Sequence, residues 1–252
     1  MEPILRVEHL TKTFIRKGQP DVTAVRDVTF SLFPGECLGL IGESGSGKST
    51  TVNLITCLLD ATEGRVLLEG KDITNVKGSA RRRLYRRMQM VFQTPAESFD
   101  PRRTLGDGIG ESLRNRGLSA SGTRRETARL LGLCGLPEEF ARRYPHQVSG
   151  GQCQRAAIAR ALAVGPRLLI CDEATSALDV TIQREILDLL RRLRGELGLS
   201  ILFICHDIAL VQSFCDRVLV MYRGEIVEEG RPDEVIRRPR DPYTRRLIDS
   251  IL

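Results

Sequence analysis

One glycine-rich stretch, Gly42-Glu-Ser-Gly-Ser-Gly-Lys-Ser49, constrains this chain more than any other. It matches the pattern G-x-x-x-x-G-K-[ST], a loop whose backbone N–H groups surround phosphate oxygens. Gly42, Gly45 and Gly47 can adopt conformations that a Cβ atom disfavours, so successive N–H groups can turn inward. Lys48 would supply positive charge to the β- and γ-phosphates, and the Ser49 hydroxyl is a hard oxygen ligand for Mg²⁺.

The flanking sequence has the order that such a phosphate loop requires. Residues 36–41 form a short apolar run suited to a buried strand, and residues 50–59 suit a helix. The N-terminus of that helix would add a dipole and unpaired N–H groups that favour a bound anion. A chance Gly/Ser turn is the alternative, and the strand–loop–helix context argues against it.

Composition and charge exclude several classes of protein. The 252 residues are 28% charged and 41% hydrophobic, which is ordinary for a globular domain. No apolar run reaches the roughly 18–20 residues needed to span a bilayer, and the first residues lack the pattern of a secretion signal, so we expect a cytosolic protein. The net charge of +6 is spread over short helical clusters, and we expect no nucleic-acid partner.

The seven cysteines show no C-x-x-C pair and are scattered along the chain. Most of them lie in apolar runs. Buried, reduced thiols are therefore expected in place of disulfides or a zinc site.

Strands and helices alternate along most of the chain. Residues 4–7 and 25–32 read as an antiparallel pair, and apolar strands are expected at 64–70, 88–92, 167–172 and 200–205. Helices are expected at 152–163 and 180–197, and a hairpin at 218–229. From Thr94 to about Val148 only helical, amphipathic segments occur. The pattern predicts an α/β fold with a mostly parallel sheet, an antiparallel β edge and an inserted α-helical subdomain.

Two adjacent carboxylates, Asp172 and Glu173, follow an unbroken apolar strand. Simply burying two carboxylates at this position would be costly, because burial disfavours their charged forms. A Mg²⁺ ion held by Asp172, and a catalytic water that gives a proton to Glu173, would explain both. A plain surface turn is the alternative, and the phosphate loop in the same chain makes it the weaker one.

Three further residues stand where a nucleotide site would need them. His206 closes the next strand, and loops at the carboxyl ends of parallel strands form such sites, so it could orient the γ-phosphate. Gln93 follows another strand and could ligate Mg²⁺ or sense the γ-phosphate. Phe14 could stack on an adenine ring or belong to the core, and the residue alone does not decide between them.

A second anion-binding helix start is predicted at Val148-Ser-Gly-Gly-Gln152. Ser149 can cap the following helix, and Gly150 and Gly151 leave N–H groups open to an anion. One nucleotide in one subunit does not need two such sites. A dimer does, because each subunit's second site could close on the nucleotide held by its partner.

This combination resembles the nucleotide-binding subunit of ABC transporters, over almost the whole chain. The motifs carrying the likeness are Walker A at Gly42–Ser49, the Q-loop at Gln93, the signature at Val148–Gln152, Walker B ending at Asp172 with Glu173, the D-loop ending at Asp179, and His206. Val148 stands where Leu is commoner, and Ala174 replaces a frequent Pro; neither change touches the chemistry.

The resemblance implies a P-loop NTPase (RecA-like) core at 1–93 and 153–230, a helical subdomain at 94–152 and a C-terminal tail at 231–252, together one ABC ATPase domain. It implies catalytic roles for Lys48, Gln93, Glu173 and His206, and Mg²⁺ ligation by Ser49, Gln93 and Asp172. It also assigns adenine stacking to Phe14. The implied ATP-binding residues are Phe14, Gly42, Glu43, Ser44, Gly45, Ser46, Gly47, Lys48, Ser49, Thr50, Ser149, Gly150, Gly151, Gln152 and Asp179.

Within that family, residues 93–102, 172–179 and the tail Asp241-Pro-Tyr-Thr-Arg245 resemble ATPases of oligopeptide, dipeptide and nickel importers. Asp241 stands where such tails often have His. The resemblance implies ATP and Mg²⁺ as cofactors, a second ABC ATPase subunit in a homo- or heterodimer, two membrane permease subunits, and indirectly an extracytoplasmic solute-binding protein. The protein would then sit peripherally on the cytoplasmic face of the cell membrane.

Two alternatives stay open from sequence alone. One is an ABC ATPase acting on nucleic acid or ribosomes, motivated by the overall basicity. The other is a cassette within a non-transport enzyme complex, similar to the phosphonate-degradation relatives. The tail and the residues after Gln93 favour the importer.

Overall fold

The computed structural model describes residues 2–15, 18, 20–174 and 179–249, the side chain of residue 97 excepted. The chain divides into two compact units. The first unit joins residues 1–84 to residues 199–252, and the second comprises residues 85–198. Each unit has its own strands and helices.

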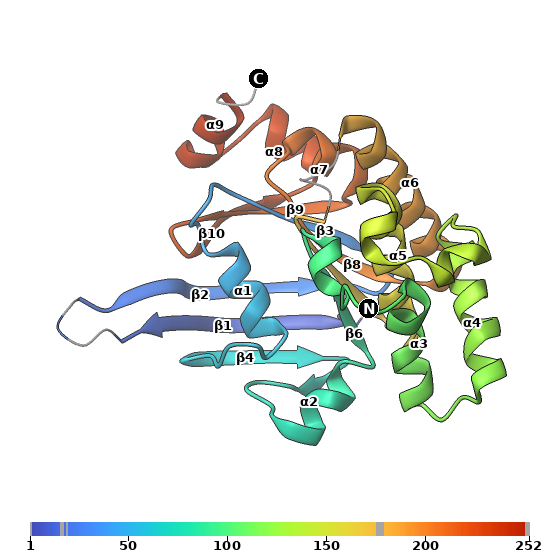
Figure 1. Cartoon of the computed structure of the whole chain (residues 1–252). Coiled ribbons are helices and arrows are strands. Elements are labelled where there is room, and N and C mark those ends of the chain that lie inside the picture. Colours follow the sequence, from blue (N-terminus) through green and yellow to red (C-terminus); the bar gives the residue numbers. More distant parts are fainter. Residues whose placement is uncertain (1, 16–17, 19, 175–178, 250–252) are drawn as a thin grey trace. The chain divides into compact units, whose positions relative to one another are not determined.

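The first unit contains an antiparallel sheet in the order β2-β1-β4-β5. Its strands are β1 (Leu5–Phe14), β2 (Val22–Leu32), β4 (Glu63–Leu68) and β5 (Lys71–Asp72). Leu5 of β1 pairs with Leu32 of β2, and the side chains of Leu5, Val7 and Leu10 are fully buried while their neighbours are exposed or half-buried. This alternation is typical of a sheet with one face on a core. Figure 1 shows β2, β1 and β4 side by side, and this sheet is the antiparallel edge that the sequence predicts.

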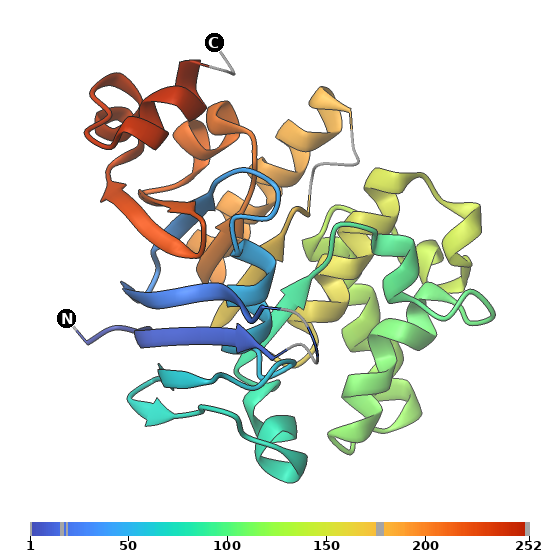
Figure 2. The same cartoon turned by 90° about the vertical axis from the view of Figure 1, so that its left-hand side faces the viewer.

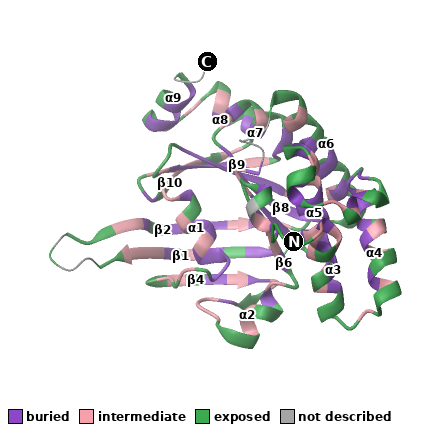
Figure 3. Cartoon of the chain, viewed as in Figure 1, coloured by how far each residue is buried: buried purple, intermediate pink, exposed green. Residues whose placement is uncertain are grey.

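A second set of strands in the first unit runs in the order β10-β9-β3-β8. They are β3 (Cys37–Ile41), β8 (Ser200–Ile204), β9 (Arg217–Tyr222) and β10 (Glu225–Gly230). β3 is parallel to both β8 and β9, so Leu40 pairs with Ile204 and with Leu219. Every residue of β3 and β8 is buried. Figure 3 colours the buried residues of the chain purple. Continuous apolar strands of this kind are covered on both faces.

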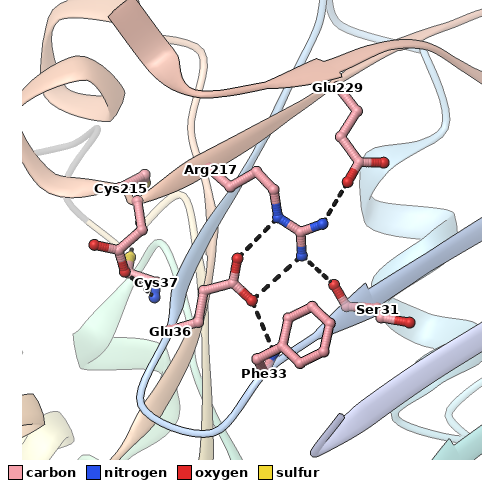
Figure 4. A network of polar contacts seen from close by, with 8 residues as sticks. Ser31, Phe33, Glu36, Cys37, Cys215, Arg217 and Glu229 are labelled. Atoms are coloured by element: carbon pink, nitrogen blue, oxygen red, sulfur yellow. Dashed lines mark hydrogen bonds and ion pairs between the residues drawn. The ribbon is translucent and has the colours of Figure 1, made fainter. Parts of the chain in front are cut away.

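A polar network around Arg217 fastens β9 to the segment that enters β3 (Figure 4). The guanidinium Nε lies 2.8 Å from Glu36 Oε1, and the same group also pairs with Glu229 and donates to the carbonyl oxygen of Ser31. Glu36 Oε2 accepts a hydrogen bond from the Phe33 N–H at 2.7 Å. Partial burial alone would lower the pKa of Arg217, but the hydrogen bonds and charges of Glu36 and Glu229 raise it. The network therefore holds the start of β3 in place with a permanently charged side chain.

The described residues of the first unit form the helices α1 (Lys48–Ile55), α2 (Gly78–Leu84), α7 (Ile208–Phe214), α8 (Pro232–Arg237) and α9 (Pro242–Asp249). α8 and α9 both pack on β10, and Figure 2 shows these red C-terminal helices beside that strand. α2 carries three consecutive arginines, Arg81–Arg83, in its last turn.

The second unit contains two parallel strands, β6 (Met88–Val91) and β7 (Leu168–Asp172), with Val91 paired to Cys171. Its α-helices are α3 (Leu105–Asn115), α4 (Ala120–Leu133), α5 (Gly150–Leu162) and α6 (Val180–Leu197). Among the described residues, the short 3₁₀ segment η1 (Pro95–Ser98) precedes α3, and η2 (Glu138–Arg142) and η3 (Pro145–Gln147) lie between α4 and α5. α5 is the central helix, because it packs on α3, α4, α6 and β6.

The fold class expected from the sequence is confirmed: helices alternate with strands that are mostly parallel, and an antiparallel sheet is added. The precise domain limits at 93 and 153 stay a prediction. All seven cysteines are buried, and among the described residues they form no disulfide. Of the helices in the described part of the chain, none combines the length and apolar character that crossing a bilayer requires.

Candidate functional site

The phosphate loop, Gly42–Ser49, connects β3 to α1 in the first unit. The Lys48 side chain is 6% exposed, which is unusual for a lysine. Its ammonium donates hydrogen bonds to the carbonyl oxygens of Gly42 at 2.7 Å and Glu43 at 2.8 Å. These backbone oxygens thus hold the ammonium inside the loop. The oxygens of a bound phosphate could replace them as its partners.

Glycine is required at two positions of this loop. Gly42 has φ 150° and Gly47 has φ 110°. A Cβ atom on Gly42 would overlap the carbonyl oxygen of Met221, and one on Gly47 would lie 2.8 Å from the Met221 methyl group. Gly47 is also the N-cap of α1 and, having no side chain, provides no side-chain cap to the first turn. A helix start without a side-chain cap has N–H groups available to an anion.

The remaining predicted residues of the loop lie at its surface or just inside it. Ser44 and Ser49 are exposed, Thr50 is half-buried in α1, and Ser46 is buried with a hydroxyl that has no hydrogen-bond partner among the described residues. The Ser46 carbonyl oxygen accepts a hydrogen bond from the Gly224 N–H at 2.8 Å. The turn between β9 and β10 therefore supports the loop from outside.

His206 stands on the same sheet edge as the phosphate loop. β3 and β8 are parallel and paired at Leu40 and Ile204, so the residues that follow them, Gly42 and His206, leave the sheet at one edge. His206 is exposed and precedes Asp207, whose carboxylate caps α7 by accepting from Ala209 N at 2.8 Å. That cap fixes where the strand stops and the helix begins.

Phe14 is the last residue of β1, and 37% of its surface is exposed. The Lys12 ammonium lies 5.3 Å from the centre of its ring. An accessible aromatic face at a strand end is consistent with stacking on a planar ring, and the core alternative is less suited to this exposure.

Gln93, Asp172 and Glu173 are brought together within the second unit. Val91 of β6 pairs with Cys171 of the parallel strand β7, so Gln93 and Asp172 follow at the same edge. Glu173 has φ 48°, a left-handed conformation that is uncommon for a residue with a side chain. Such a conformation costs about 1–3 kcal/mol and concentrates at functional sites.

The predicted second helix start also lies in the second unit. Ser149 Oγ accepts from the Gln152 N–H at 3.3 Å, while Gln152 Oε1 accepts from the Ser149 N–H at 3.0 Å. This capping box begins α5. A Cβ atom on Gly151 would lie 2.6 Å from Ile182 Cγ2 of α6, so Gly is needed for that close approach.

Asp179 is the N-cap of α6, and its carboxylate accepts a hydrogen bond from the Ile182 N–H at 3.0 Å. Three of the residues predicted as D-loop, at positions 176–178, lie outside the described residues. Ile182 thus connects the two segments within the second unit, because its side chain lies against Gly151 and its N–H donates to Asp179.

The predicted magnesium ligands fit that ion in their chemistry. Ser49 offers a hydroxyl, Gln93 an amide oxygen and Asp172 a carboxylate, and such oxygen donors are those that Mg²⁺ prefers. Among the described residues no cluster of three or more His, Cys, Asp or Glu could hold a metal by itself.

Comparison with known proteins decides the family. Residues 25–176 match the model described as ABC transporter. The chain belongs to the ABC transporter family. Over 237 residues it is 47% identical to the oligopeptide transport ATP-binding protein OppF of Salmonella typhimurium, covering 92% of this chain and 71% of OppF. It is 46% identical to a probable peptide ABC transporter ATP-binding protein, y4tS, of Sinorhizobium fredii, covering 98% and 72%.

A longer ABC relative is the glutathione import ATP-binding protein GsiA of Pectobacterium atrosepticum. It is 46% identical over 99% of this chain, which spans 41% of the length of GsiA. Among solved structures, a dimeric, post-hydrolysis state of the ATP-binding cassette MJ0796 with ADP and Pi superposes with a TM-score of 0.82 at 31% identity, covering 90% of this chain and 98% of that one. CbiO1 of Clostridium perfringens superposes at 0.85 and 30%, covering 94% and 92%.

One residue near the Walker A loop was missed by sequence reasoning. The Tyr243 hydroxyl accepts a hydrogen bond from the Glu43 N–H at 2.9 Å. The tail Asp241–Arg245 was recognised as a family feature, yet nothing in its sequence indicates that it reaches the loop. The burial of Tyr243, which is 4% exposed, is visible only in the folded structure.

Proposed function

We propose that this chain is the ATP-binding and ATP-hydrolysing subunit of an importer for peptides or related solutes. The observation that supports this best is the Walker A loop, with the Lys48 ammonium held 2.7 Å from the Gly42 carbonyl oxygen beside an uncapped helix start. The named relatives import oligopeptides, peptides or glutathione. Nickel or another chelated metal remains a second class of cargo within the same proposal.

The chemistry of the proposal is phosphoryl transfer from ATP to water. Lys48 exchanges its carbonyl partners for the β- and γ-phosphate oxygens, while the loop and the first turn of α1 supply N–H groups. Ser49, Gln93 and Asp172 would hold a Mg²⁺ ion, which would supply positive charge to the phosphates when bound. Glu173 accepts a proton from the attacking water, the bond from the γ-phosphorus to the bridging oxygen breaks, and ADP and phosphate leave.

His206 and Gln93 would orient the water and the γ-phosphate, and Phe14 would stack on the adenine. These are positioning roles, and phosphoryl transfer depends mainly on positioning and charge stabilisation. His206 and Gln93 are both exposed, so both are accessible to a nucleotide.

A second subunit would complete the ATP site. Ser149–Gln152 begin α5, and Asp179 caps α6 nearby. These residues would form a second anion-binding arrangement, which one nucleotide in one subunit does not require. We propose that these residues close on the nucleotide bound to Walker A of a partner ATPase, which is either a copy of this chain or a different ABC ATPase. A cassette at 31% identity is dimeric with ADP and Pi.

The membrane partner would bind to the helical subdomain. α3, α4 and η2 surround a cavity of about 690 Å³. Thr123 and Thr127 line it with buried hydroxyls that have no hydrogen-bond partner among the described residues. Arg124 and Arg142 stand at its wall together with Glu138. The charged lining, with Arg124 and Arg142 beside Glu138, fits a polar protein segment better than a purely apolar one. We therefore propose that a cytoplasmic segment of a permease subunit binds here, at the inner face of the membrane.

Affinity purification from detergent-solubilised membranes tests the proposal. We expect two permease subunits and an ABC ATPase to co-purify, with the solute-binding protein associating through the permease. Arg124→Glu together with Arg142→Glu should reduce permease recovery at least tenfold. Arg129→Glu is the control, since Arg129 lies on the same helix and pairs with Glu126 but does not line the cavity. Recovery of ribosomes or nucleic acid in place of membrane subunits would contradict the importer.

A further inference from the structure

Tyr243 of α9 is bound directly to the Walker A loop from a position 200 residues away. Its side chain is 4% exposed, and its hydroxyl oxygen lies 2.9 Å from the backbone nitrogen of Glu43, the second residue of the loop. Because that N–H donates outward, it does not belong to the N–H groups that face a phosphate. It has a different use.

The peptide unit between Gly42 and Glu43 is held at both ends. Its N–H donates to Tyr243, and its carbonyl oxygen, that of Gly42, accepts from the Lys48 ammonium at 2.7 Å. In a trans peptide these two groups point in opposite directions within one plane. Fixing the N–H therefore fixes the direction of the carbonyl group that holds Lys48.

The Tyr243 ring is fixed by its own neighbour. It stacks on Tyr222 with ring centres 4.0 Å apart and planes 23° apart. Tyr222 ends β9, and Gly224 two residues later donates its N–H to the Ser46 carbonyl oxygen at 2.8 Å. The loop is thus bound at Glu43 by the tail and at Ser46 by the turn, and the stacked rings connect the two supports.

Glu228 of β10 sets the position of the tail. Its carboxylate accepts hydrogen bonds from the N–H groups of Arg240 at 2.9 Å and Asp241 at 3.1 Å. Asp241 in turn accepts from the Tyr243 N–H at 2.7 Å. These bonds fix where α9 begins, and so where the Tyr243 ring lies.

We propose that Tyr243 is a positioning residue for the Walker A loop: its hydroxyl fixes the Gly42–Glu43 peptide plane, and through it the Lys48 ammonium, before nucleotide binds. The proposal rests on the proposed function, since it assumes that phosphates bind at this loop. A loop ordered in advance loses less freedom when its ligand binds. Burial raises the pKa of Tyr243 above its usual value, so the hydroxyl stays protonated at physiological pH.

Tyr243→Phe removes the hydroxyl and keeps the stacked ring. In the full chain we expect the Kd for ATP and for ADP to rise about tenfold, because the Glu43 N–H loses its partner and the loop must be ordered on binding. We expect KM for ATP to rise similarly, with kcat at saturating ATP within about twofold of wild type. In the absence of nucleotide, hydrogen exchange at the Glu43 amide should be at least tenfold faster in Tyr243→Phe than in wild type.

Thr244→Val is the matched control. Thr244 follows Tyr243 in α9, is fully buried, and its hydroxyl has no hydrogen-bond partner among the described residues. We expect this variant to bind ATP as wild type does. If both variants lose binding equally, or if Tyr243→Phe leaves Kd and Glu43 exchange unchanged, the proposal is wrong. If the wild type binds no ATP, the proposed function fails, yet Glu43 exchange still tests the hydroxyl.

Discussion

A Cβ atom on Gly42 would overlap the carbonyl oxygen of Met221 in β9. Gly42 has φ 150°, so the first residue of the Walker A loop combines a backbone conformation that favours glycine with a close approach to a neighbouring strand. Because glycine has no Cβ atom, the loop can pass this close to β9. The close approach also shows that the loop's shape is set by the packing of the first unit.

Gly42→Ala should therefore destabilise the protein, by about 3 kcal/mol in the free energy of unfolding, and should abolish ATP binding. Gly45→Ala is the control, because Gly45 also has positive φ, at 80°, but no atom lies within 4 Å of its added Cβ. We expect it to cost only about 1 kcal/mol. Urea denaturation measures both; equal losses would contradict the close approach.

The Arg217–Glu36 pair should stabilise the fold measurably, because both side chains are largely buried. Arg217→Met leaves Glu36 and Glu229 without their guanidinium partner, and we expect a loss of about 3 kcal/mol. Arg129→Met breaks the exposed Arg129–Glu126 pair and should cost less than about 1 kcal/mol. Thermal or chemical denaturation of the two variants compares them, and a similar small loss in both would refute a structural role for the network in Figure 4.

Cys134 should make the protein's stability fall at alkaline pH. Burial raises the pKa of this thiol from 9.0 to about 12, so the folded protein holds the proton more tightly than the unfolded chain. The stabilisation is complete below pH 9 and is lost as the pH rises from 9 towards 12.

Cys134→Ala removes that titration. Between pH 8 and pH 10.5 we expect the free energy of unfolding of wild type to fall by on the order of 1–2 kcal/mol more than that of the variant. Other alkaline groups contribute equally to both proteins. Parallel pH profiles for the two would show that the Cys134 thiol does not titrate differently on unfolding.

Much of the candidate site could be predicted from sequence because its signals are local. The glycines of residues 42–47, the Ser149–Gln152 capping box and the apolar run before Asp172 each lie within a few residues of the chemistry that they position. The limits of the strands were predicted less accurately. β1 extends to Phe14, well beyond the predicted residues 4–7, because its pairing with β2 continues along both strands.

Long-range contacts could not be predicted in this way. The Tyr243–Glu43 hydrogen bond and the Arg217–Glu36 pair join residues far apart in sequence, and only tertiary packing brings them together. The left-handed backbone of Glu173 was also unforeseen, since glutamate has no local preference for it. The cavity beside α3 and α4 is lined by residues of two helices and of η2, which only the folded structure brings together.

The most direct test of the proposed function is steady-state ATP hydrolysis by Glu173→Gln, measured in the purified membrane complex beside ATP binding. Glutamine keeps the size of the side chain but cannot accept the proton from water, so we expect an ATP Kd like that of wild type and turnover at least about 100-fold lower. Glu196→Gln, at an exposed site on α6, should hydrolyse ATP normally. Near-normal turnover in Glu173→Gln would contradict the role of Glu173 as the general base.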